Sequence, residues 1–316
     1  MEQAKAQGPG YPVNSDAAAE LEADAARSSA AGTLTVAAAP IGQPADASGR
    51  LGPALAAAGL IAAEDTRRLR RLAGVLGVRL TGRVVSYYDQ VEARRAAELI
   101  AELAAGQDVL LITDAGMPGV SDPGYRLVAA AAAAGIKVTA VPGPSAVTTA
   151  LAVSGLPTDR FVFEGFPPRK AGERARRFAE LRAEPRTLVF FESPRRVGTT
   201  VAELASSFGP DRRAVLCREL TKTHEEILRG TLGELAQLAR DGVLGEVTLV
   251  IEGAPPAGGA AATAEAVGEV MRRARGGMSR KDAIASVAAE RGLRRRELYA
   301  AVVAGAADDG GSTARR

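Results

Sequence analysis

The chain has 316 residues, of which 47% are hydrophobic and 24% are charged, and its formal net charge is +3. This length exceeds one typical domain, so two or three domains are expected. A single cysteine and a single histidine exclude an internal disulfide, a zinc site with four nitrogen or sulfur ligands, and a histidine-rich metal centre. We therefore expect no metal site; carboxylate-bound magnesium stays open, but no dedicated cage is visible. No apolar run reaches the roughly 18 residues of a membrane helix, and the start does not resemble a signal peptide. A cytoplasmic protein without membrane contact is expected.

Residues 1–31 are rich in alanine, glycine, serine and acidic residues, and they are predicted to be a disordered extension. From residue 32 onward, short apolar runs alternate with helical stretches. This alternation is typical of βαβ units with a parallel sheet. The predicted strands of this first set are 34–39, 60–63, 84–85, 109–112 and 138–141, with helices at 92–105 and 125–134.

A second set of elements begins after Gly155-Leu156-Pro157 and predicts a second α/β domain. Its strands are 161–163, 187–191, 214–217 and 247–251, with a helix at 197–206. The composition of 254–259 predicts a linker, and the remainder is helical. The predicted division is an extension at 1–31, α/β domains at 32–153 and 154–254, and a linker with a helical domain at 255–316.

The C-terminal region predicts two short helices around a glycine turn, an arrangement that resembles a helix-turn-helix. Ser279 and Asp282 have the spacing of a helix start, and Gly292 is expected to end that helix. The expected apolar faces comprise Ile284, Val287 and Ala288 on the first helix, and Leu298, Tyr299, Val302 and Val303 on the second.

Three loops rich in glycine and proline follow strands of the first predicted sheet. They are residues 39–43, 113–124 and 142–146. Because ligands of open α/β sheets bind at the carboxyl ends of strands, we expect the loops to converge on one cleft. Asp114 and Asp122 could hydrogen-bond ribose hydroxyls or an amine, although tight turns formed by aspartate would have the same composition. No phosphate-binding motif occurs, which disfavours a phosphate-bearing cofactor.

At these loops the chain resembles the ribosomal RNA small subunit methyltransferase I family, within the tetrapyrrole-methylase superfamily. The matching motifs occur in the correct order from about residue 32 to the last strand, and the C-terminal helices also fit. They include Pro40-Ile41-Gly42, Ala63-Glu64-Asp65-Thr66-Arg67, Asp114-Ala115-Gly116, Ser121-Asp122-Pro123-Gly124, Pro142-Gly143-Pro144-Ser145-Ala146, Glu192-Ser193-Pro194 and Arg218-Glu219-Leu220-Thr221-Lys222. The chain departs from the family at Ala39 and Gln43, where Thr and Asn are usual, and at residues 88–91, where the family often has His and Asn.

The resemblance implies two α/β domains of the tetrapyrrole-methylase (class III methyltransferase) fold, a small C-terminal helical domain, and a homodimer. It also implies S-adenosyl-L-methionine as the cofactor, bound between the two domains. The cofactor-binding residues expected from the three loops and from this analogy are Pro40, Gly42, Asp114, Ala115, Gly116, Pro118, Ser121, Asp122, Ser145, Ala146, Phe191 and Glu192.

The implied acceptor, a ribose hydroxyl, is a weak nucleophile, so a base or a positive neighbour is expected to assist. The candidates for a catalytic role are Asp65, Arg67 and Lys222, and His224 and Glu225 lie beside the last. Two alternatives stay open. The Asp65–Arg67 segment could equally be an acidic helix start, and a lone histidine is more often a structural hydrogen-bonding residue.

Arginine-rich clusters recur at residues 67–71, 169–177, 195–196, 272–275 and 294–296. Solvated helix faces would have the same appearance, but such clusters also suit RNA phosphates. The resemblance thus implies S-adenosylmethionine-dependent 2′-O-methylation of a cytidine ribose in 16S ribosomal RNA. The arginines of the C-terminal helices, which follow a linker, further predict that the helical domain docks the small ribosomal subunit, although a helical cap that only stabilises the second domain is the alternative. A tetrapyrrole-type small-molecule methyltransferase and a non-catalytic ribosome assembly factor are the alternatives.

Overall fold

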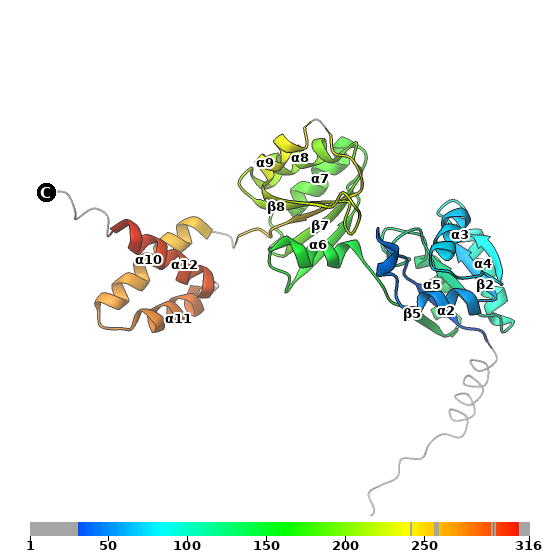
Figure 1. Ribbon diagram of the computed structural model, residues 1–316. Coiled ribbons are helices and arrows are strands. Elements are labelled where there is room, and N and C mark those ends of the chain that lie inside the picture. Colours follow the sequence, from blue (N-terminus) through cyan, green and yellow to red (C-terminus); the bar gives the residue numbers. More distant parts are fainter. Residues whose placement is uncertain (1–30, 241, 256–258, 292, 294, 310–316) are drawn as a thin grey trace, which may run out of the picture.

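The computed structural model describes residues 31–240, 242–255, 259–291, 293 and 295–309, and it contains two α/β bodies followed by a helical body (Figure 1). The fold class expected from the sequence is therefore confirmed. The predicted extension at 1–31 lies outside the described residues except for its last residue, and so do Gly292 and the centre of the predicted linker. Among the helices described, none is both long enough and apolar enough to cross a membrane.

The first body is a five-stranded parallel sheet with the order β3-β2-β4-β1-β5. Its strands are β1 (Leu34–Ala37), β2 (Leu60–Ala63), β3 (Arg83–Ser86), β4 (Val109–Ile112) and β5 (Val138–Val141). The strands end level, since Ala37 is paired with Ile112 and with Val141, and Ile112 with Ala63. The loops that follow them therefore leave from one edge of the sheet.

Helices cover both faces of this sheet, which is why the central strands are continuous apolar runs rather than alternating ones. The helical elements are η1 (Pro44–Asp46), α2 (Leu51–Ala57), α3 (Thr66–Val75), α4 (Glu92–Ala104) and α5 (Tyr125–Ala133). Leu34 and Leu111 belong to the core beneath α4 and α5. Ile61 and Leu110 belong to the core beneath α2 and α3. Successive strand residues thus point to opposite cores, as the pleat requires.

The second body is a mixed sheet with the order β6-β7-β10-β8-β9, in which only β6 and β7 are parallel. Its strands are β6 (Phe161–Gly165), β7 (Thr187–Glu192), β8 (Arg213–Arg218), β9 (Glu226–Thr231) and β10 (Val247–Ile251). One face is covered by α7 (Ala171–Leu181), α8 (Val197–Phe208) and α9 (Leu232–Leu238), whose apolar residues share a core with Phe190, Leu216 and Leu249.

The other face of the second sheet is covered by α6 (Ala146–Ser154), which directly follows the last loop of the first sheet. Val147 and Leu151 of this helix are buried together with Val215 and Val250 of the second sheet. Ile41, from the first body, belongs to the same buried cluster. Helix α6 therefore joins the two bodies through packing as well as through the chain, while the boundary at 153/154 remains a prediction.

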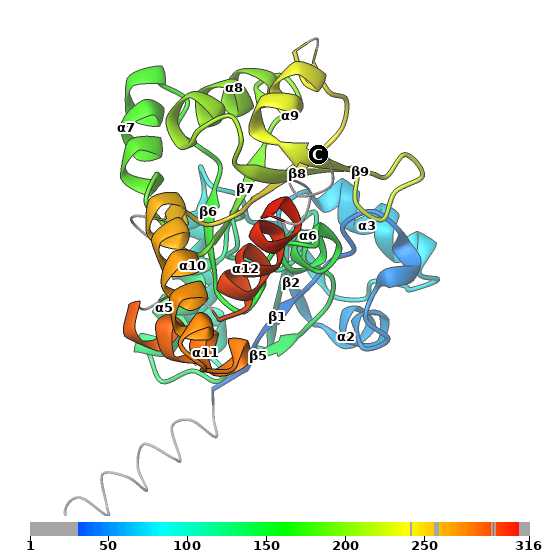
Figure 2. The same ribbon diagram turned by 90° about the vertical axis from the view of Figure 1, so that its left-hand side faces the viewer.

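The helical body consists of α10 (Gly259–Arg275), α11 (Arg280–Arg291) and α12 (Arg295–Asp309), seen in orange and red in Figure 2. Ser279 accepts a hydrogen bond from the Asp282 amide at 3.1 Å, so the predicted helix start is confirmed. The predicted second apolar face is half wrong. Leu298 is buried, but Tyr299 and Val303 are 59% and 53% exposed, because α12 turns only one of its sides toward α10 and α11.

Candidate functional site

A cavity of about 330 Å³ lies where the loops of the first sheet meet the ends of β7 and β10. Both α/β bodies contribute to its walls, so it is the cleft that the three loops were expected to form. It is lined by Ile41, Ala115, Gly116, Met117, Val120, Ser121, Asp122, Ser145, Ala146, Phe166, Phe191, Glu192, Ser193, Pro194, Glu246, Val247 and Thr248.

Eight of the twelve predicted cofactor-binding residues line this cavity: Ala115, Gly116, Ser121, Asp122, Ser145, Ala146, Phe191 and Glu192. The remaining four do not. Pro40, Gly42 and Asp114 line a smaller cavity of about 120 Å³, whose walls also include Glu64, Asp65 and Arg68. Pro118 is buried within its own loop. The structure thus brings eight of the predicted residues to one cavity and places the other four outside it, while their contact with a cofactor stays a prediction.

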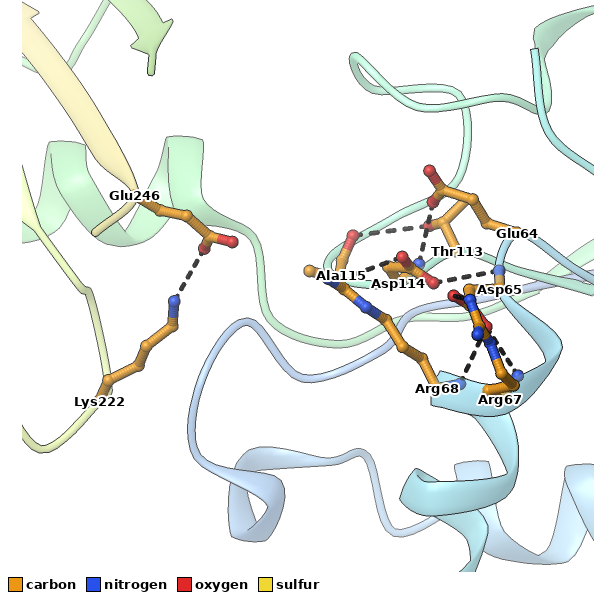
Figure 3. A network of polar contacts seen from close by, with 9 residues as sticks. All are labelled: Glu64, Asp65, Arg67, Arg68, Thr113, Asp114, Ala115, Lys222 and Glu246. Carbon is orange, nitrogen blue, oxygen red and sulfur yellow. Dashed lines mark hydrogen bonds and ion pairs between the residues drawn. The ribbon is translucent and has the colours of Figure 1, made fainter. Parts of the chain in front are cut away.

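Asp114 is the centre of a polar network between the ends of β2 and β4, shown in Figure 3. Its backbone amide donates to a Glu64 carboxylate oxygen at 3.1 Å, and its own carboxylate accepts from the Asp65 amide at 3.2 Å. Arg68 forms an ion pair with the Asp114 carboxylate at 3.2 Å. Asp114 is thus held by contacts within the first body, and it stiffens the loop rather than reaching into the main cavity.

Three carboxyls near the cleft, those of Glu64, Asp114 and Asp122, have raised pKa values. Burial raises the pKa of Glu64, against the hydrogen bond from the Asp114 amide. Burial also raises the pKa of Asp114, against the positive charge of Arg68. The strongest case is Asp122, whose pKa rises to about 7 because it is buried and because Glu64, Asp114 and further carboxylates surround it. Such a site favours a positively charged ligand.

Lys222 lies on the second body, across the cleft from the Asp114 network (Figure 3). Its ammonium group forms ion pairs with Glu219 at 2.9 Å and with Glu246, a residue of the cavity wall, at 3.0 Å. Burial acts to lower the pKa of Lys222, but these two carboxylates outweigh it and raise the pKa. Lys222 is therefore held in its charged form and can serve as a positive charge, not as a base.

Of the three predicted catalytic residues, Asp65 and Arg67 lie together on the first body, whereas Lys222 lies apart from them on the second (Figure 3). Asp65 is the N-cap of α3 and accepts hydrogen bonds from the Arg67 and Arg68 amides at 2.7 and 3.3 Å. These bonds lower its pKa, which makes it a weaker base. The Arg67 side chain is 87% exposed and pairs only loosely with Asp65, at 3.5 Å. The structural reading of this segment as a helix start is thus supported by the geometry.

Glu192 lines the cavity, but its carboxylate is engaged elsewhere. It accepts from the Thr200 hydroxyl at 2.6 Å and from the Ser193 amide at 2.7 Å, and Arg196 lies 3.3 Å away. Its role is therefore to fix the turn after β7, and the backbone of that turn forms the cavity wall.

Sequence reasoning missed several residues of the site, of which Glu64, Arg68, Phe166 and Glu246 matter most. The signal for Glu64 was present, because it directly follows a predicted strand, β2, which is paired with β4 beside the Asp114 loop. Phe166 and Glu246 lie in two further motifs that match the family, Gly165-Phe166 and Gly245-Glu246, but no role was assigned to them. The mixed order of the second sheet decides which strand ends reach the cleft, and the sequence does not reveal that order. No cluster of metal-binding side chains is found within the described part of the chain.

Comparisons with known proteins identify the family of the chain. The family model described as Tetrapyrrole (Corrin/Porphyrin) Methylases matches residues 33–236. A ribosomal RNA small subunit methyltransferase I of Mycobacterium tuberculosis (strain CDC 1551 / Oshkosh) is 51% identical over 281 residues, which cover 89% of this chain and 98% of that protein. A protein of the same name from Synechocystis sp. is 40% identical and covers 85% of this chain and 96% of its own length.

Solved structures share the fold at low sequence identity. The methyltransferase CobJ has a TM-score of 0.54 and 22% identity, covering 71% of this chain and 95% of that one. A diphthine synthase has a TM-score of 0.52 and 18% identity, covering 70% of this chain and 89% of that one. These likenesses concern the two-sheet fold alone. From the matching family model and the high identity over nearly the whole chain, this protein belongs to the tetrapyrrole methylase family and, within it, to the ribosomal RNA small subunit methyltransferase I family.

Proposed function

We propose that the chain transfers a methyl group from S-adenosyl-L-methionine to the ribose 2′-hydroxyl of a cytidine in 16S ribosomal RNA. The observation that carries this proposal is 51% identity to a named ribosomal RNA small subunit methyltransferase I across 89% of the chain. The proposed substrate places the reaction on the small ribosomal subunit in the cytoplasm. The proposed assembly is a homodimer, which rests on the family resemblance alone.

The size and charge of the main cavity support this cofactor. Its volume of about 330 Å³ falls at the lower end of the usual range for ligand pockets. S-adenosylmethionine is a cation at its sulfonium and ammonium groups. No lysine or arginine lines the cavity, and three acidic residues do. Two of these, Glu192 and Glu246, are paired with Arg196 and Lys222, so Asp122 is the main source of negative charge. Phe166 and Phe191 stack edge-to-face at 5.7 Å and supply an apolar wall suited to an adenine ring.

When bound, the cofactor supplies an already activated methyl group, so the protein must mainly align the acceptor oxygen and exclude water. We propose that Asp122 holds the positive end of the cofactor, and that Phe191 and Ala146 enclose its apolar part. Among the candidate bases, Asp65 is disfavoured by its lowered pKa, whereas Glu64 has a raised pKa and lines the adjoining small cavity. Glu64 is therefore the better candidate to take the ribose proton.

The function is tested by incubating the protein with methyl-labelled S-adenosylmethionine and small ribosomal subunits that lack the modification. We expect the label on one ribose of 16S RNA, where the adjoining phosphodiester then resists alkaline hydrolysis. Mass spectrometry of nuclease fragments locates the labelled nucleotide. Label on a base, or preferential transfer to an added tetrapyrrole, would contradict the proposal. Absence of transfer together with tight subunit binding would favour the assembly-factor alternative.

We further propose that the helical body docks the RNA substrate. Not every predicted basic cluster is available for this: Arg174 is buried in a bidentate pair with Glu203, and Arg273 is tied to Glu269 and Glu290. On α12, by contrast, Arg295, Arg296, Tyr299 and Val303 are exposed at helical spacing. An exposed aromatic ring beside two guanidinium groups can stack on an unpaired base while the arginines reach phosphates.

Two substitutions on α12 separate these contributions. Arg296→Gln should weaken subunit binding and reduce the slope of affinity against salt by about 0.7 to 0.9, as expected for one lost phosphate contact. Tyr299→Ala should weaken binding by roughly 5- to 100-fold with the slope unchanged. Arg79→Gln, at an exposed position of the first body, is the charge-matched control. Unchanged affinity and slope in both α12 variants would show that the helical body does not dock RNA; weaker self-association instead would identify a second copy as the occupant.

A further inference from the structure

The loop that carries Ser121 and Asp122 is held in an unusual backbone conformation. Gly116, Gly119, Ser121 and Gly124 all have left-handed φ angles, of 68°, 84°, 64° and 146°. For a non-glycine residue such as Ser121 this conformation costs free energy, so the surroundings must impose it. The hydrogen bonds within the loop are long. The Gly119 amide donates to the Pro123 carbonyl at 3.3 Å, and the Val120 amide donates to the Met117 carbonyl at 3.4 Å.

The start and the end of this loop are anchored differently. At the start, Gly116 and Ala39 exchange backbone hydrogen bonds of 2.9 and 3.0 Å, which tie the loop to the end of β1. At the end, the Gly124 amide donates to a carboxylate oxygen of Glu92 at 2.9 Å. The Glu92 contact is a side-chain anchor from another helix, α4, and it fixes the point where the loop enters α5.

Glu92 is itself positioned by a buried partner. It is one of the few buried carboxylates in the described chain, and it accepts a hydrogen bond from the Tyr87 hydroxyl at 3.2 Å. Tyr87 is fully buried, and burial together with the Glu92 carboxylate raises the pKa of its hydroxyl, which therefore stays protonated and donates. Arg126 lies 3.4 Å from the second carboxylate oxygen.

This arrangement replaces a missing helix cap. The N-cap of α5 is Gly124, which has no side chain to bond the free amides of the first turn. A larger residue does not fit there, since a Cβ would lie 3.0 Å from the Gly119 amide and 3.2 Å from Leu111 and Pro118. The Glu92 carboxylate, supplied by α4, accepts from the amide of Gly124 itself and places a negative charge at the positive end of the α5 dipole.

We propose that Glu92, oriented by Tyr87, is a positioning residue that fixes the Ser121–Asp122 loop for the cofactor without touching the cofactor. The proposal rests on the proposed function, because it assigns that loop to S-adenosylmethionine. Without the carboxylate, the Gly124 amide is left buried and unpaired, and the strained loop loses the anchor of its second end. Cofactor binding must then reorder the loop, which weakens affinity.

The test measures S-adenosylmethionine binding by calorimetry and amide exchange of residues 117–124 in the cofactor-free protein. Glu92→Ala should weaken cofactor binding about tenfold or more and speed exchange at Gly124. Glu92→Gln keeps an oxygen that can accept from both donors, so it should retain affinity within about threefold. Tyr87→Phe keeps the buried ring, and its cofactor affinity should lie between those of Glu92→Ala and Glu92→Gln. This variant provides the test if Glu92→Ala folds poorly.

Asp108→Ala is the matched control. Its carboxylate also accepts a backbone amide of the first body, from Thr33 at 2.7 Å, but at the opposite edge of the sheet. It should lower Tm and leave cofactor affinity unchanged. Wild-type affinity and wild-type exchange in Glu92→Ala would overturn the inference, as would an equal loss of affinity in Asp108→Ala. If the wild type binds no S-adenosylmethionine, the proposed function fails, while the exchange data still decide whether Glu92 anchors the loop.

Discussion

Replacing Asp122 by asparagine is expected to weaken S-adenosylmethionine binding about tenfold or more at pH 8 and to abolish the pH dependence of binding. The carboxylate lines the main cavity among other acidic groups, and its pKa is raised to about 7 by burial and by those neighbours. Only the ionised form attracts the cationic cofactor. In the wild type, affinity should therefore fall about tenfold between pH 8 and pH 6, because protonation competes with binding.

In the cofactor-free protein, ionisation of Asp122 should lower the stability of the fold, whereas it strengthens cofactor binding. The pKa of about 7 in the folded chain lies above the ordinary value of 3.8, so folding favours the protonated carboxyl. The stability that Asp122 contributes is fully present below about pH 4 and is lost as the pH rises through 7. Asp122→Asn should remove this loss. Calorimetric titrations at pH 6, 7 and 8, with Tm measured at each pH, follow both effects; a pH-independent wild-type affinity would contradict the assignment.

Gly42→Ala is expected to reduce kcat/KM roughly 10- to 100-fold, although the substitution adds a single methyl group. A Cβ at this position would lie 2.5 Å from Lys222 and Thr221 side-chain atoms and 2.8 Å from the Leu220 carbonyl oxygen. The Lys222 side chain can move away, but a backbone carbonyl cannot move without shifting the loop. The two α/β bodies would separate here, and the adjacent hydrogen bond from the Gln43 amide to the Thr221 hydroxyl, of 3.1 Å, would be broken.

A small displacement of this kind is costly because methyl transfer depends on alignment, and an error of about 1 Å can cost a hundredfold in rate. Gly49→Ala is the matched control, since a Cβ there would meet no atom within 4 Å. Steady-state kinetics with small subunits and scanning calorimetry distinguish a local effect from global destabilisation. Activity equal to the wild type in Gly42→Ala would show that the contact between the two bodies at this point does not shape the site.

The first sheet was predictable from the sequence because each of its central strands is buried on both faces. Runs such as Leu60–Ala63 and Val109–Ile112 contain no polar residue, so the sequence shows where each run begins and ends. These two strands are observed with the predicted bounds. The second sheet was harder. Strand β9, Glu226–Thr231, lies at an edge and is only half-buried, so its sequence lacks the apolar run that identifies a strand.

The loops that form the main cavity were predictable, whereas the direction of each side chain was predictable only in part. A glycine-rich loop after a strand indicates a ligand, but which residue faces it depends on backbone angles such as the left-handed φ of Ser121. Asp114 illustrates the limit: its motif drew attention to it, yet its carboxylate pairs with Arg68 inside the first body. Lys222 was equally visible as a motif, but its partner Glu246 comes from a segment 24 residues away.

The packing of α6 determines how the molecule should come apart. This helix packs against the second sheet, and its first residue, Ala146, lines the cavity. Ile41 of the first body belongs to the same core. Neither α/β body can therefore unfold without exposing apolar surface of the other. The helical body has a separate core of its own, built from residues of α10, α11 and α12. Heating is thus expected to reveal two cooperative units rather than three, and a ligand of the cavity should raise the melting temperature of the larger unit alone.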